Sequence, residues 1–417
     1  MAIGALFTPP EGYYFETTRN NDGSYQIRTK SGKTYIFESV AGTVDQKAKL
    51  LKVVDRNQNI LTLSYNGDGT LYRVTDDLNR YIEFAYVNSR ISQITDWLGR
   101  QFQYGYNATG DLVTVSDPVV LAGNKNPVTY SYYTSSTLEH LMSGYTLPKG
   151  NDISYEYYAD GRLFKQTTLS NAIITYRYDD FHRETVMINE RGFTKKTYYD
   201  PNGNVTKIIN ENGGVTTTTY DETRYMNKVA SVSASGMQTR YSYDNNGNAT
   251  QLRLPSGNTI VKSYFNAFGQ PGKVKDVNGN YTIYKYDNKG NTLEQISFAS
   301  GYGASVDPNS YVVVPNQIKA WTINTYDQFG NVKTAKRVRD FSSGEGPTIS
   351  YNYNDTVNSY LGLKPVTVTR SGDMNGDGTI ETNENESASL VYDAYGRVTQ
   401  GIDSNWYMTN FEYNAID

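Results

Sequence analysis

The stretch from Asp373 to Glu384, DMNGDGTIETNE, carries oxygen-bearing side chains at a spacing that suits a hard cation. It satisfies the pattern D-x-[DN]-x-[DN]-G-x5-E of calcium loops in full. The expected ligands are Asp373, Asn375, Asp377, the Thr379 carbonyl, Glu381 and Glu384. Gly378 would make the sharp turn that wraps these oxygens around one point. We therefore predict a Ca²⁺ site here, with an acidic surface loop as the alternative.

The segments on either side of this loop, KPVTVTR and SASLVYD, are typical of strands, whereas an EF-hand has helices there. We therefore predict a structural calcium loop between strands and not a calcium sensor. The metal would rigidify an insertion, with the weak affinity that suits extracellular calcium.

Other residues that could carry chemistry give weaker signals. The two histidines, His140 and His182, have no cysteine or third ligand near them in the sequence. The GYGAS segment at 301–305 resembles a nucleophile turn but lacks the strand–turn–helix context. An aspartate follows many of the tyrosines, and its regular recurrence favours a role in turns over a carboxylate pair. We predict no catalytic residue, so the chain is not expected to be an enzyme.

These aspartates belong to an eight-residue pattern that recurs along the chain, as in YSYDNNGN at 241–248 and YKYDNKGN at 284–291. Anchored on the tyrosine before the turn, the pattern has a base period of 21 residues, with longer intervals at insertions. Such self-similarity is the signature of a repeat array. The anchors are Tyr65, Tyr86, Tyr106, Tyr132, Tyr157, Tyr178, Tyr199, Tyr220, Tyr243, Tyr264, Tyr286, Tyr326, Tyr353, Tyr392 and Tyr413.

Each repeat predicts two strands and two turns. Gly recurs four residues after the anchor, as at Gly290, and Gly or Asn recurs seven residues before it, as at Gly279. Both residue types accept a positive φ at low cost. The alternating YTIYKY segment at 281–286 places Tyr284 and Tyr286 on one face of a strand. Which face of the sheet these rows take stays open, because a one-residue slip in register would exchange the faces.

The composition favours a curled wall over a solid globule. The 417 residues include 39 Tyr and 36 Gly, and hydrophobic residues make up 37% even with Tyr counted. That leaves few apolar residues for a two-layer core, and a tyrosine can bury its ring while its hydroxyl stays wet. A single antiparallel sheet of about thirty strands cannot stay open and flat, so we expect it to curl around a space.

Charge and hydropathy exclude some partners. The net charge is −4 and no basic cluster alternates with aromatic residues, which disfavours nucleic acid. No apolar run approaches about 18 residues, so we expect no membrane span. The start, MAIGALFTPPEGYYF, lacks the basic region of a secretory signal.

The YDxxGN element at a 21-residue period resembles the Rhs, or YD-repeat, family from about residue 55 to 417. The early segment LFTPPEGYYFETTRNNDGSYQIRTKSGKTYIFESV is similar to the region that opens the repeat block in Rhs proteins. That family includes bacterial Rhs toxins, the B and C components of insecticidal toxin complexes, and the teneurins. The resemblance implies an all-β fold in which one spiralling sheet forms a hollow shell. In the toxins, this shell encloses a C-terminal toxic polypeptide.

The sequence departs from the full toxin pattern, because no segment before Asp417 resembles the one that closes the shell and carries the self-cleavage aspartates. The resemblance therefore implies a wall segment of a longer parent protein, secreted or at the bacterial cell surface. We divide the chain into a β-rich start or cap at 1–54 and a repeat sheet at 55–417. Insertions are expected at 107–131, 133–150, 297–320 and 354–388, the last of which contains the calcium-type loop.

Three functions are weighed from the sequence. The leading hypothesis is a structural shell that encloses a polypeptide and has other shell segments as partners. The alternative is a carbohydrate-binding or adhesive module that uses exposed tyrosine rows. A polysaccharide-cleaving enzyme would need a unique carboxylate cluster, and the sequence shows none. Open sheet edges also predict self-association.

Overall fold

The computed structural model describes residues 6–7, 9, 13–39, 47–135, 137–224, 227–298, 301–353, 364–373, 384–393, 396–405 and 407–413. These residues form one antiparallel sheet of 34 strands, with one short α-helix and two 3₁₀ turns, so the predicted all-β repeat sheet is confirmed. The first half of the sheet comprises β1 (Leu6–Phe7), β2 (Phe15–Arg19), β3 (Tyr25–Thr29), β4 (Thr34–Phe37), β5 (Leu50–Val54), β6 (Ile60–Tyr65), β7 (Leu71–Asp76), β8 (Tyr81–Val87), β9 (Arg90–Asp96), β10 (Gln101–Tyr106), β11 (Leu112–Ser116), α1 (Pro118–Leu121), β12 (Val128–Tyr132), β13 (Met142–Thr146), β14 (Asp152–Tyr157), β15 (Leu163–Thr167), β16 (Ile173–Asp179) and β17 (Glu184–Ile188). The second half comprises β18 (Thr194–Tyr199), β19 (Val205–Ile209), β20 (Val215–Tyr220), β21 (Lys228–Val232), β22 (Gln238–Tyr243), β23 (Ala249–Arg253), β24 (Thr259–Phe265), β25 (Pro271–Lys275), β26 (Tyr281–Tyr286), β27 (Thr292–Phe298), η1 (Tyr302–Ala304), η2 (Pro315–Gln317), β28 (Ile318–Tyr326), β29 (Val332–Val338), β30 (Thr348–Asn352), β31 (Thr367–Ser371), β32 (Glu386–Tyr392), β33 (Val398–Ile402) and β34 (Met408–Asn410).

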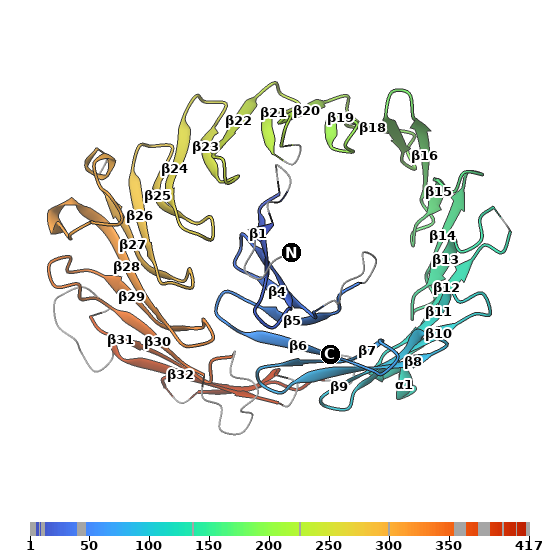
Figure 1. Ribbon diagram of the computed structural model, residues 1–417, viewed down its shortest axis with the longest axis horizontal. Helices are drawn as coiled ribbons and strands as arrows, with labels where there is room; N and C mark the ends of the chain where they lie inside the picture. Colours follow the sequence, from blue (N-terminus) through green and yellow to red (C-terminus); the bar gives the residue numbers. More distant parts are fainter. Residues whose placement is uncertain are drawn as a thin grey trace.

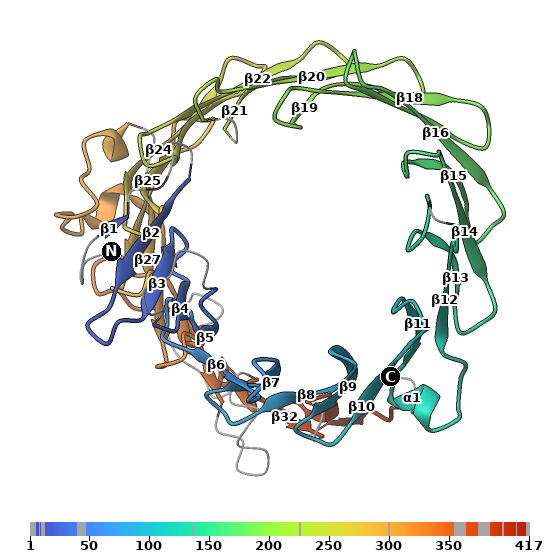
Figure 2. The ribbon, with the colours of Figure 1, turned by 45° about the vertical axis from the view of Figure 1, so that its right-hand side comes forward.

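Every strand pairs with its neighbours in sequence, from β1–β2 to β33–β34, and every pair is antiparallel. Successive turns therefore alternate between two opposite rims of the sheet. The strands follow one another around a ring, and β30–β32 return to the side of β6–β9 in both views (Figures 1 and 2). The sheet is thus a spiral of more than one turn, as its right-handed strand twist requires of so many strands.

The register separates the two faces of this sheet. Residues directly opposite one another on paired strands lie on the same face, and consecutive residues lie on opposite faces. Ile283 is opposite Lys273 on one side and Ile296 on the other, so these three side chains share a face. Tyr284, opposite Gln295, lies on the other face.

An insertion between β27 and β28 identifies the outer face. It contains η1 and η2 and lies on the outside of the ring in both ribbon views (Figures 1 and 2). Its Val306 packs with the buried Ile283 and Ile296, and Tyr302 lies 5.7 Å from the Phe298 ring. The face of Ile283 is therefore the outer face of the ring. The GYGAS segment at 301–305, which the sequence predicts to be a loop without a catalytic role, contains η1 of this cover.

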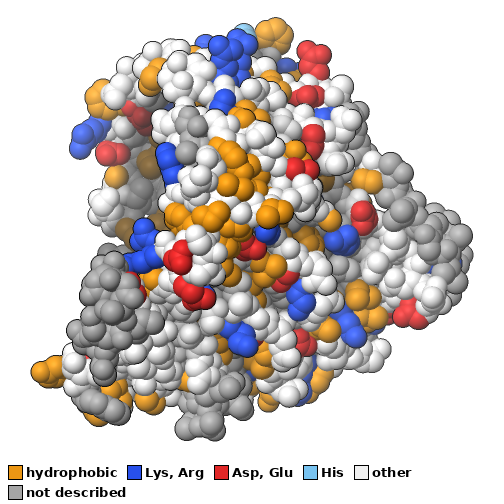
Figure 3. Space-filling view, turned by 90° about the vertical axis from the view of Figure 1, so that its left-hand side faces the viewer, with side chains coloured by type: hydrophobic (Ala, Val, Ile, Leu, Met, Phe, Trp, Pro, Cys, Tyr) orange, Lys and Arg blue, Asp and Glu red, His pale blue; other side chains and the backbone are white. Residues whose placement is uncertain are grey.

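A buried lysine fixes this insertion to the wall. Lys273 is 7% exposed, and its Nζ donates to the carbonyls of Ala304 at 2.8 Å and Val306 at 2.7 Å. Burial lowers the pKa of Lys273. On this side of the molecule, hydrophobic side chains gather in the middle of the surface, with charges of both signs around them (Figure 3).

Regular strands run through the other ranges in which insertions are expected. β11 and most of β12 fall within 107–131, β13 falls within 133–150, and β31 falls within 354–388. In the N-terminal segment, β2–β5 pair directly into the same sheet, without a break at residue 54.

Candidate functional site

The repeated turn is held by its aspartate, in the way that the sequence predicts. In the turn 287–291, Asp287 Oδ1 accepts from the backbone N–H of Lys289 at 2.9 Å and of Asn291 at 2.8 Å. Its Oδ2 accepts from Asn291 Nδ2 at 2.9 Å, and Gly290 has a φ of 80°. The carboxylate thus replaces backbone partners that this tight turn cannot provide. We call this arrangement the YD turn.

The opposite rim uses the same chemistry, which sequence reasoning missed. Asp276 accepts from the N–H groups of Asn278 and Asn280, both at 2.8 Å, and Asn280 Nδ2 donates to its second oxygen. The amide of Asn280 lowers the pKa of Asp276. The sequence carries a partial signal for this, because Asp precedes the earlier Gly by three residues at Asp96 and Asp276, and Asn takes this place at Asn189 and Asn210.

Anchor tyrosines tie each repeat to the previous one. Tyr286 donates its hydroxyl to the carbonyl of Pro271 at 2.9 Å, and Pro271 directly follows the preceding turn. In seven tyrosines the acceptor lies 15 residues earlier: Tyr65, Tyr86, Tyr106, Tyr157, Tyr243, Tyr286 and Tyr413. Burial raises the pKa of Tyr286 to about 12, because the ionised phenolate would lose its hydration.

One predicted anchor is wrong. The turn 266–270 follows Phe265, whose partner across the strand pair is Pro271, and Asn266 Oδ1 accepts from the N–H groups of Phe268 and Gln270. Tyr264 is one residue too early, has a φ of 57° and is 46% exposed. The sequence misled because tyrosine is the usual residue at this position, and here phenylalanine replaces it.

The tyrosine rows lie on the inner face together with aliphatic side chains. Tyr284 and Tyr286 stack with their ring centroids 6.4 Å apart. Following the register around the sheet gives inner-face residues Val53, Leu63, Val74, Phe84, Ile94, Tyr104, Val115, Val128, Tyr145, Tyr155, Ile174, Tyr241, Leu252, Ile260, Val274 and Tyr284. Leu61 and Ile82, also on this face, are 43% and 40% exposed. The inner face is therefore rich in apolar side chains from β5 to β16 and from β22 to β26, whereas from β17 to β21 it also carries Thr185, Lys195, Thr197, Thr216, Thr218 and Ser231.

The outer face carries ion pairs at many of the corresponding positions. Lys165 Nζ lies 2.6 Å from Glu156, and Lys285 Nζ lies 3.3 Å from Glu294. In β5–β16 this alternation turns ion pairs outward and many apolar side chains inward, whereas in β17–β20 the outer face carries Val186, Ile188, Ile209 and Val215.

The spiral is joined where its second turn passes the first. Asn57, in the turn between β5 and β6, accepts from Asn291 Nδ2 at 2.8 Å through its side chain and from Lys289 Nζ at 3.0 Å through its carbonyl. Asn59 Nδ2 donates to the carbonyl of Phe329 at 3.0 Å. We call the contacts between the first and the second turn of the spiral the seam.

At the seam, the two turns of the spiral pack tightly and meet through opposite rims of the sheet. The β5–β6 turn meets the YD turns after β26 and β28, so one turn of the spiral takes between 21 and 23 strands. A Cβ at Gly330, where φ is 87°, would lie 2.3 Å from Asn57 Nδ2. The rim of the first spiral turn that lacks the YD turns therefore meets the rim of the second spiral turn that carries them.

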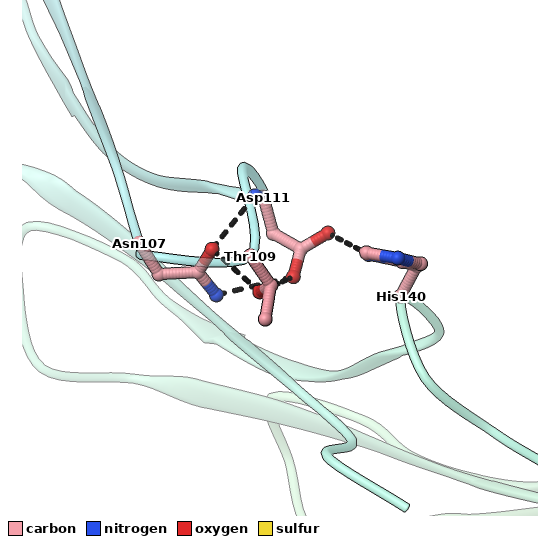
Figure 4. Close-up of polar contacts among 4 residues, drawn as sticks. All are labelled: Asn107, Thr109, Asp111 and His140. Carbon is pink, nitrogen blue, oxygen red and sulfur yellow. Dashed lines mark hydrogen bonds and ion pairs between the residues drawn. The ribbon is translucent and has the colours of Figure 1, made fainter. Parts of the chain in front are cut away.

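Each of the two histidines forms a pair with one aspartate. His140 Nδ1 lies 2.6 Å from Asp111 Oδ1, and Thr109 Oγ1 donates to the other oxygen of Asp111 at 2.8 Å (Figure 4). The hydrogen bond raises the pKa of His140 and lowers the pKa of Asp111. Thr109 bonds to the carboxylate and not to the imidazole, so the group lacks the nucleophile–base contact of a catalytic triad. In the second pair, His182 Nδ1 lies 2.6 Å from Asp179 Oδ2, and both residues belong to the same turn.

Most of the predicted calcium loop lies outside the described residues. This applies to Asn375, Asp377, Thr379 and Glu381, whereas Asp373 and Glu384 are described. Asp373 lies 3.9 Å from Arg339 Nη1, and Glu384 is 6% exposed. The two residues follow β31 and precede β32, which pair with each other. Within the described part of the chain, no three His, Asp or Glu side chains form a group that could hold a metal ion.

Comparisons with known proteins agree with the repeat pattern. The RHS Repeat family model matches residues 199–231 and 227–259. No curated protein sequence matches the chain. Among solved structures, the Photorhabdus luminescens Tc holotoxin pore with the mutation TccC3-D651A has a TM-score of 0.47 and 12% identity over 95% of this chain. The crystal structures of TcdB2-TccC3-Cdc42 and TcdB2-TccC3 have TM-scores of 0.47 and 13% identity, over 97% and 95% of the chain.

The chain spans about a quarter of the length of these structures, 25%, 26% and 25% in the same order. The identity is low and the TM-scores lie below 0.5. The likeness to the RHS Repeat family therefore rests on the repeats that its model matches, at residues 199–231 and 227–259. None of the described helices has the length or the apolar composition to traverse a lipid bilayer.

Replacing Tyr286 by Phe should weaken the link between neighbouring repeats. The substitution keeps the ring and removes the hydroxyl that bonds the Pro271 carbonyl. We expect a loss of about 1 kcal/mol in the local opening free energy of β25 and β26, measured by native-state hydrogen exchange. Tyr284→Phe, on the same strand and face, is the matched control and should change it by less than about 0.5 kcal/mol. Equal effects of the two substitutions would contradict a specific contribution of the Tyr286 hydroxyl.

The His140–Asp111 contact should depend on pH in two directions. Because the pKa of His140 is raised, its contribution to stability is complete below the pKa of the unfolded histidine and is lost as the pH rises through the raised value. Because the pKa of Asp111 is lowered, its contribution is lost as the pH falls through the lowered value. In Asp111→Asn, the pKa of His140 measured by NMR should fall toward about 6.5. The resonances of His182 are the internal control, and an unchanged pKa of His140 would refute the pairing.

Proposed function

We propose that this chain, a member of the Rhs or YD-repeat family, is a wall segment of a shell that encloses a polypeptide within a longer parent protein. The observation that best supports this is the inner face, on which aliphatic and tyrosine side chains predominate from β5 to β16 and from β22 to β26, in a sheet whose second spiral turn contacts the first at the seam. In the Rhs toxins that the sequence resembles, the shell contains the toxic polypeptide, and we propose an equivalent cargo here.

The inner face explains why a cargo would be needed. An accessible apolar surface this extended is unfavourable in water and normally marks an interaction surface. Leu61 and Ile82 are two of its members that remain 43% and 40% exposed. A polypeptide held inside would cover this surface, while the tyrosine hydroxyls could meet its backbone polar groups.

The same arrangement argues against catalysis by the wall. Its carboxylates repeat once per turn and are occupied by backbone N–H groups, as at Asp276 and Asp287. The His140–Asp111 pair connects two loops. We propose a structural role in a secreted or cell-surface bacterial protein, with the remaining shell segments as partners.

The adhesive alternative has less support. A carbohydrate-binding wall would present its tyrosine rows on the outer face, where a large glycan can reach them. Tyr284, Tyr286 and Tyr241 instead share the inner face.

We also propose that the loop from Asp373 to Glu384 binds Ca²⁺ as a structural cofactor. Two features support this proposal: the loop starts and ends beside a pair of antiparallel strands, and the carboxylate of Glu384, the expected bidentate ligand, belongs to a residue only 6% exposed. The cation would neutralise a loop with several carboxylates and fix its conformation.

The shell proposal can be tested on the purified chain. Negative-stain images should show ring-shaped particles with stain at the centre. The chain should also retain reduced, carboxymethylated α-lactalbumin, an unfolded polypeptide, in size-exclusion chromatography. Ile82→Asp, on the inner face, should weaken this retention by about tenfold, because it places a charge on the apolar surface.

Val215→Asp is the matched control, because Val215 is 39% exposed on the outer face. It should leave retention within about twofold of the unsubstituted chain, as expected for a surface substitution. Solid particles, or equal losses in the two variants, would overturn the proposal.

The calcium proposal predicts stabilisation by the metal. If the affinity is in the millimolar to submillimolar range of extracellular modules, Ca²⁺ at 100 times its dissociation constant should stabilise the loop by about 2.7 kcal/mol. Isothermal titration calorimetry on the intact chain should detect one site, and Glu384→Gln should abolish it. Glu386→Gln, which alters an exposed residue 3.8 Å from Arg370, is the control and should bind normally. Failure of the intact chain to bind Ca²⁺ would refute the site.

A further inference from the structure

The seam shows how the two rims of the sheet fit each other. We call the rim that carries the YD turns the YD rim. Phe268, the third residue after the anchor position, packs from this rim against Gly32 in the β3–β4 turn of the opposite rim. An added Cβ at Gly32 would lie 2.6 Å from Phe268 Cε1. The guanidinium carbon of Arg28 lies 5.5 Å from the centre of the same ring. An aromatic side chain of the YD rim thus fits against a rim glycine and the arginine four residues before it.

A second phenylalanine in the same sequence position is exposed to solvent. Phe181, the third residue after the anchor Tyr178, lies in the turn between β16 and β17, on the YD rim of the first spiral turn, and is 87% exposed. Its ring lies 4.9 Å from that of His182 in the same turn. A single exposed apolar side chain needs no explanation by itself. This one, however, occupies the position through which Phe268 joins the rims at the seam.

The opposite rim carries an open groove with the same parts as the seam. A groove of about 510 Å³ lies between the β21–β22 turn and the β23–β24 turn, and Met237, Arg253 and Gly257 are among its lining residues. Arg253 precedes Gly257 by four residues, as Arg28 precedes Gly32. A Cβ added at Gly257 would meet no described atom within 4 Å. Met237 is 55% exposed, so the groove also offers apolar surface.

The charges of this groove favour a carboxylate. Arg253 lies directly opposite Arg240 on the neighbouring strand, and like charges in such a pair destabilise a sheet. Within the described part of the chain, neither arginine forms an ion pair. Asp180, next to Phe181, bonds Arg162 Nη1 at 2.7 Å, and its side chain is 83% exposed. A carboxylate has two oxygens and can accept from more than one guanidinium.

We propose that the Asp180–Phe181 turn of one copy docks in this groove of a second copy of the chain. In this contact Phe181 packs against Gly257 and Met237, and Asp180 lies beside the two arginines. A second copy is the partner that presents both halves, and the contact repeats between copies the rim-to-rim packing of the seam.

The two halves lie on opposite rims of the same sheet, so one copy cannot join its own. Because the two surfaces differ, the interface is heterologous and produces open stacks rather than closed pairs. It uses turns, whereas the self-association predicted from the sequence uses sheet edges. The inference holds whether or not the wall encloses a cargo.

The test is the association state of the intact 417-residue chain, measured by sedimentation velocity from about 1 to 100 μM. Dimers and longer stacks should appear as the concentration rises. Phe181→Glu and Arg253→Glu should each weaken association by about tenfold or more, because each removes one half of the contact. Both variants should fold, since Phe181 is exposed and Arg253→Glu turns a like-charge cross-strand pair into one of opposite charge.

A mixture of the two variants tests the direction of the contact. Each variant keeps the half that the other has lost. At a concentration where each variant alone is monomeric, an equimolar mixture should therefore form dimers that grow no further. Association through sheet edges would give no such restoration, because neither substitution alters an edge strand.

Val312→Glu is the matched control, because Val312 is 78% exposed in the segment between η1 and η2 and does not line the groove. It should leave association within about twofold of the unsubstituted chain. The inference is overturned if the intact chain stays monomeric over this range, which is the result expected if another segment of a parent protein fills the groove. It is also overturned if the mixture stays monomeric, or if the control loses association as the two variants do.

Discussion

The hydrogen bonds that the turn aspartate accepts are the constraint on which the rest of the wall depends. A sheet in which every strand pairs only with its sequence neighbours needs a tight reversal at the end of each strand. Each reversal leaves backbone N–H groups that the strand ladder cannot satisfy. Asp287 and Asp276 satisfy them on opposite rims with the same geometry. Because the reversals are alike, strands of similar length return at a regular spacing, and the anchor tyrosines can reach the preceding repeat.

The sequence predicts the strands, the turns and the pairing of neighbouring strands well, because short-range patterns of residues specify them. The positions of Asp, Gly and Tyr within 21 residues specify the strands, both turns and the pairing of neighbours. The face taken by Tyr284 could not be predicted in this way, since the period-2 pattern is the same for either orientation. It is decided by the insertion that covers Ile283. The seam could not be predicted either, because no sequence pattern links Asn57 with Asn291, which lie 234 positions apart in the chain. Tyr264 shows the limit of the pattern itself, where Phe265 takes the tyrosine's place.

Stability in this wall is distributed rather than concentrated. Among the described residues, the largest side chains exposed by less than 2% are Phe298, Ile283 and Ile296, all beneath the η1–η2 insertion. Elsewhere each repeat depends on its two neighbours through ladder hydrogen bonds, cross-strand pairs and a tyrosine hydroxyl, as in other arrays with nearest-neighbour coupling. The seam adds contacts between distant repeats, and therefore couples segments that would otherwise open independently.

The long sequence separation across the seam has a consequence for synthesis. Hairpins of neighbouring strands can form as soon as both strands have left the ribosome, since their contacts are local. The seam joins residues between 213 and 270 positions apart, as in Asn227 with Tyr14 and Asn59 with Phe329. At about 5–20 residues per second, the first strands wait roughly 10–50 s for their partners. During this interval the nascent sheet is an open arc with its apolar side uncovered, and chaperones have their best access to it before the ring closes.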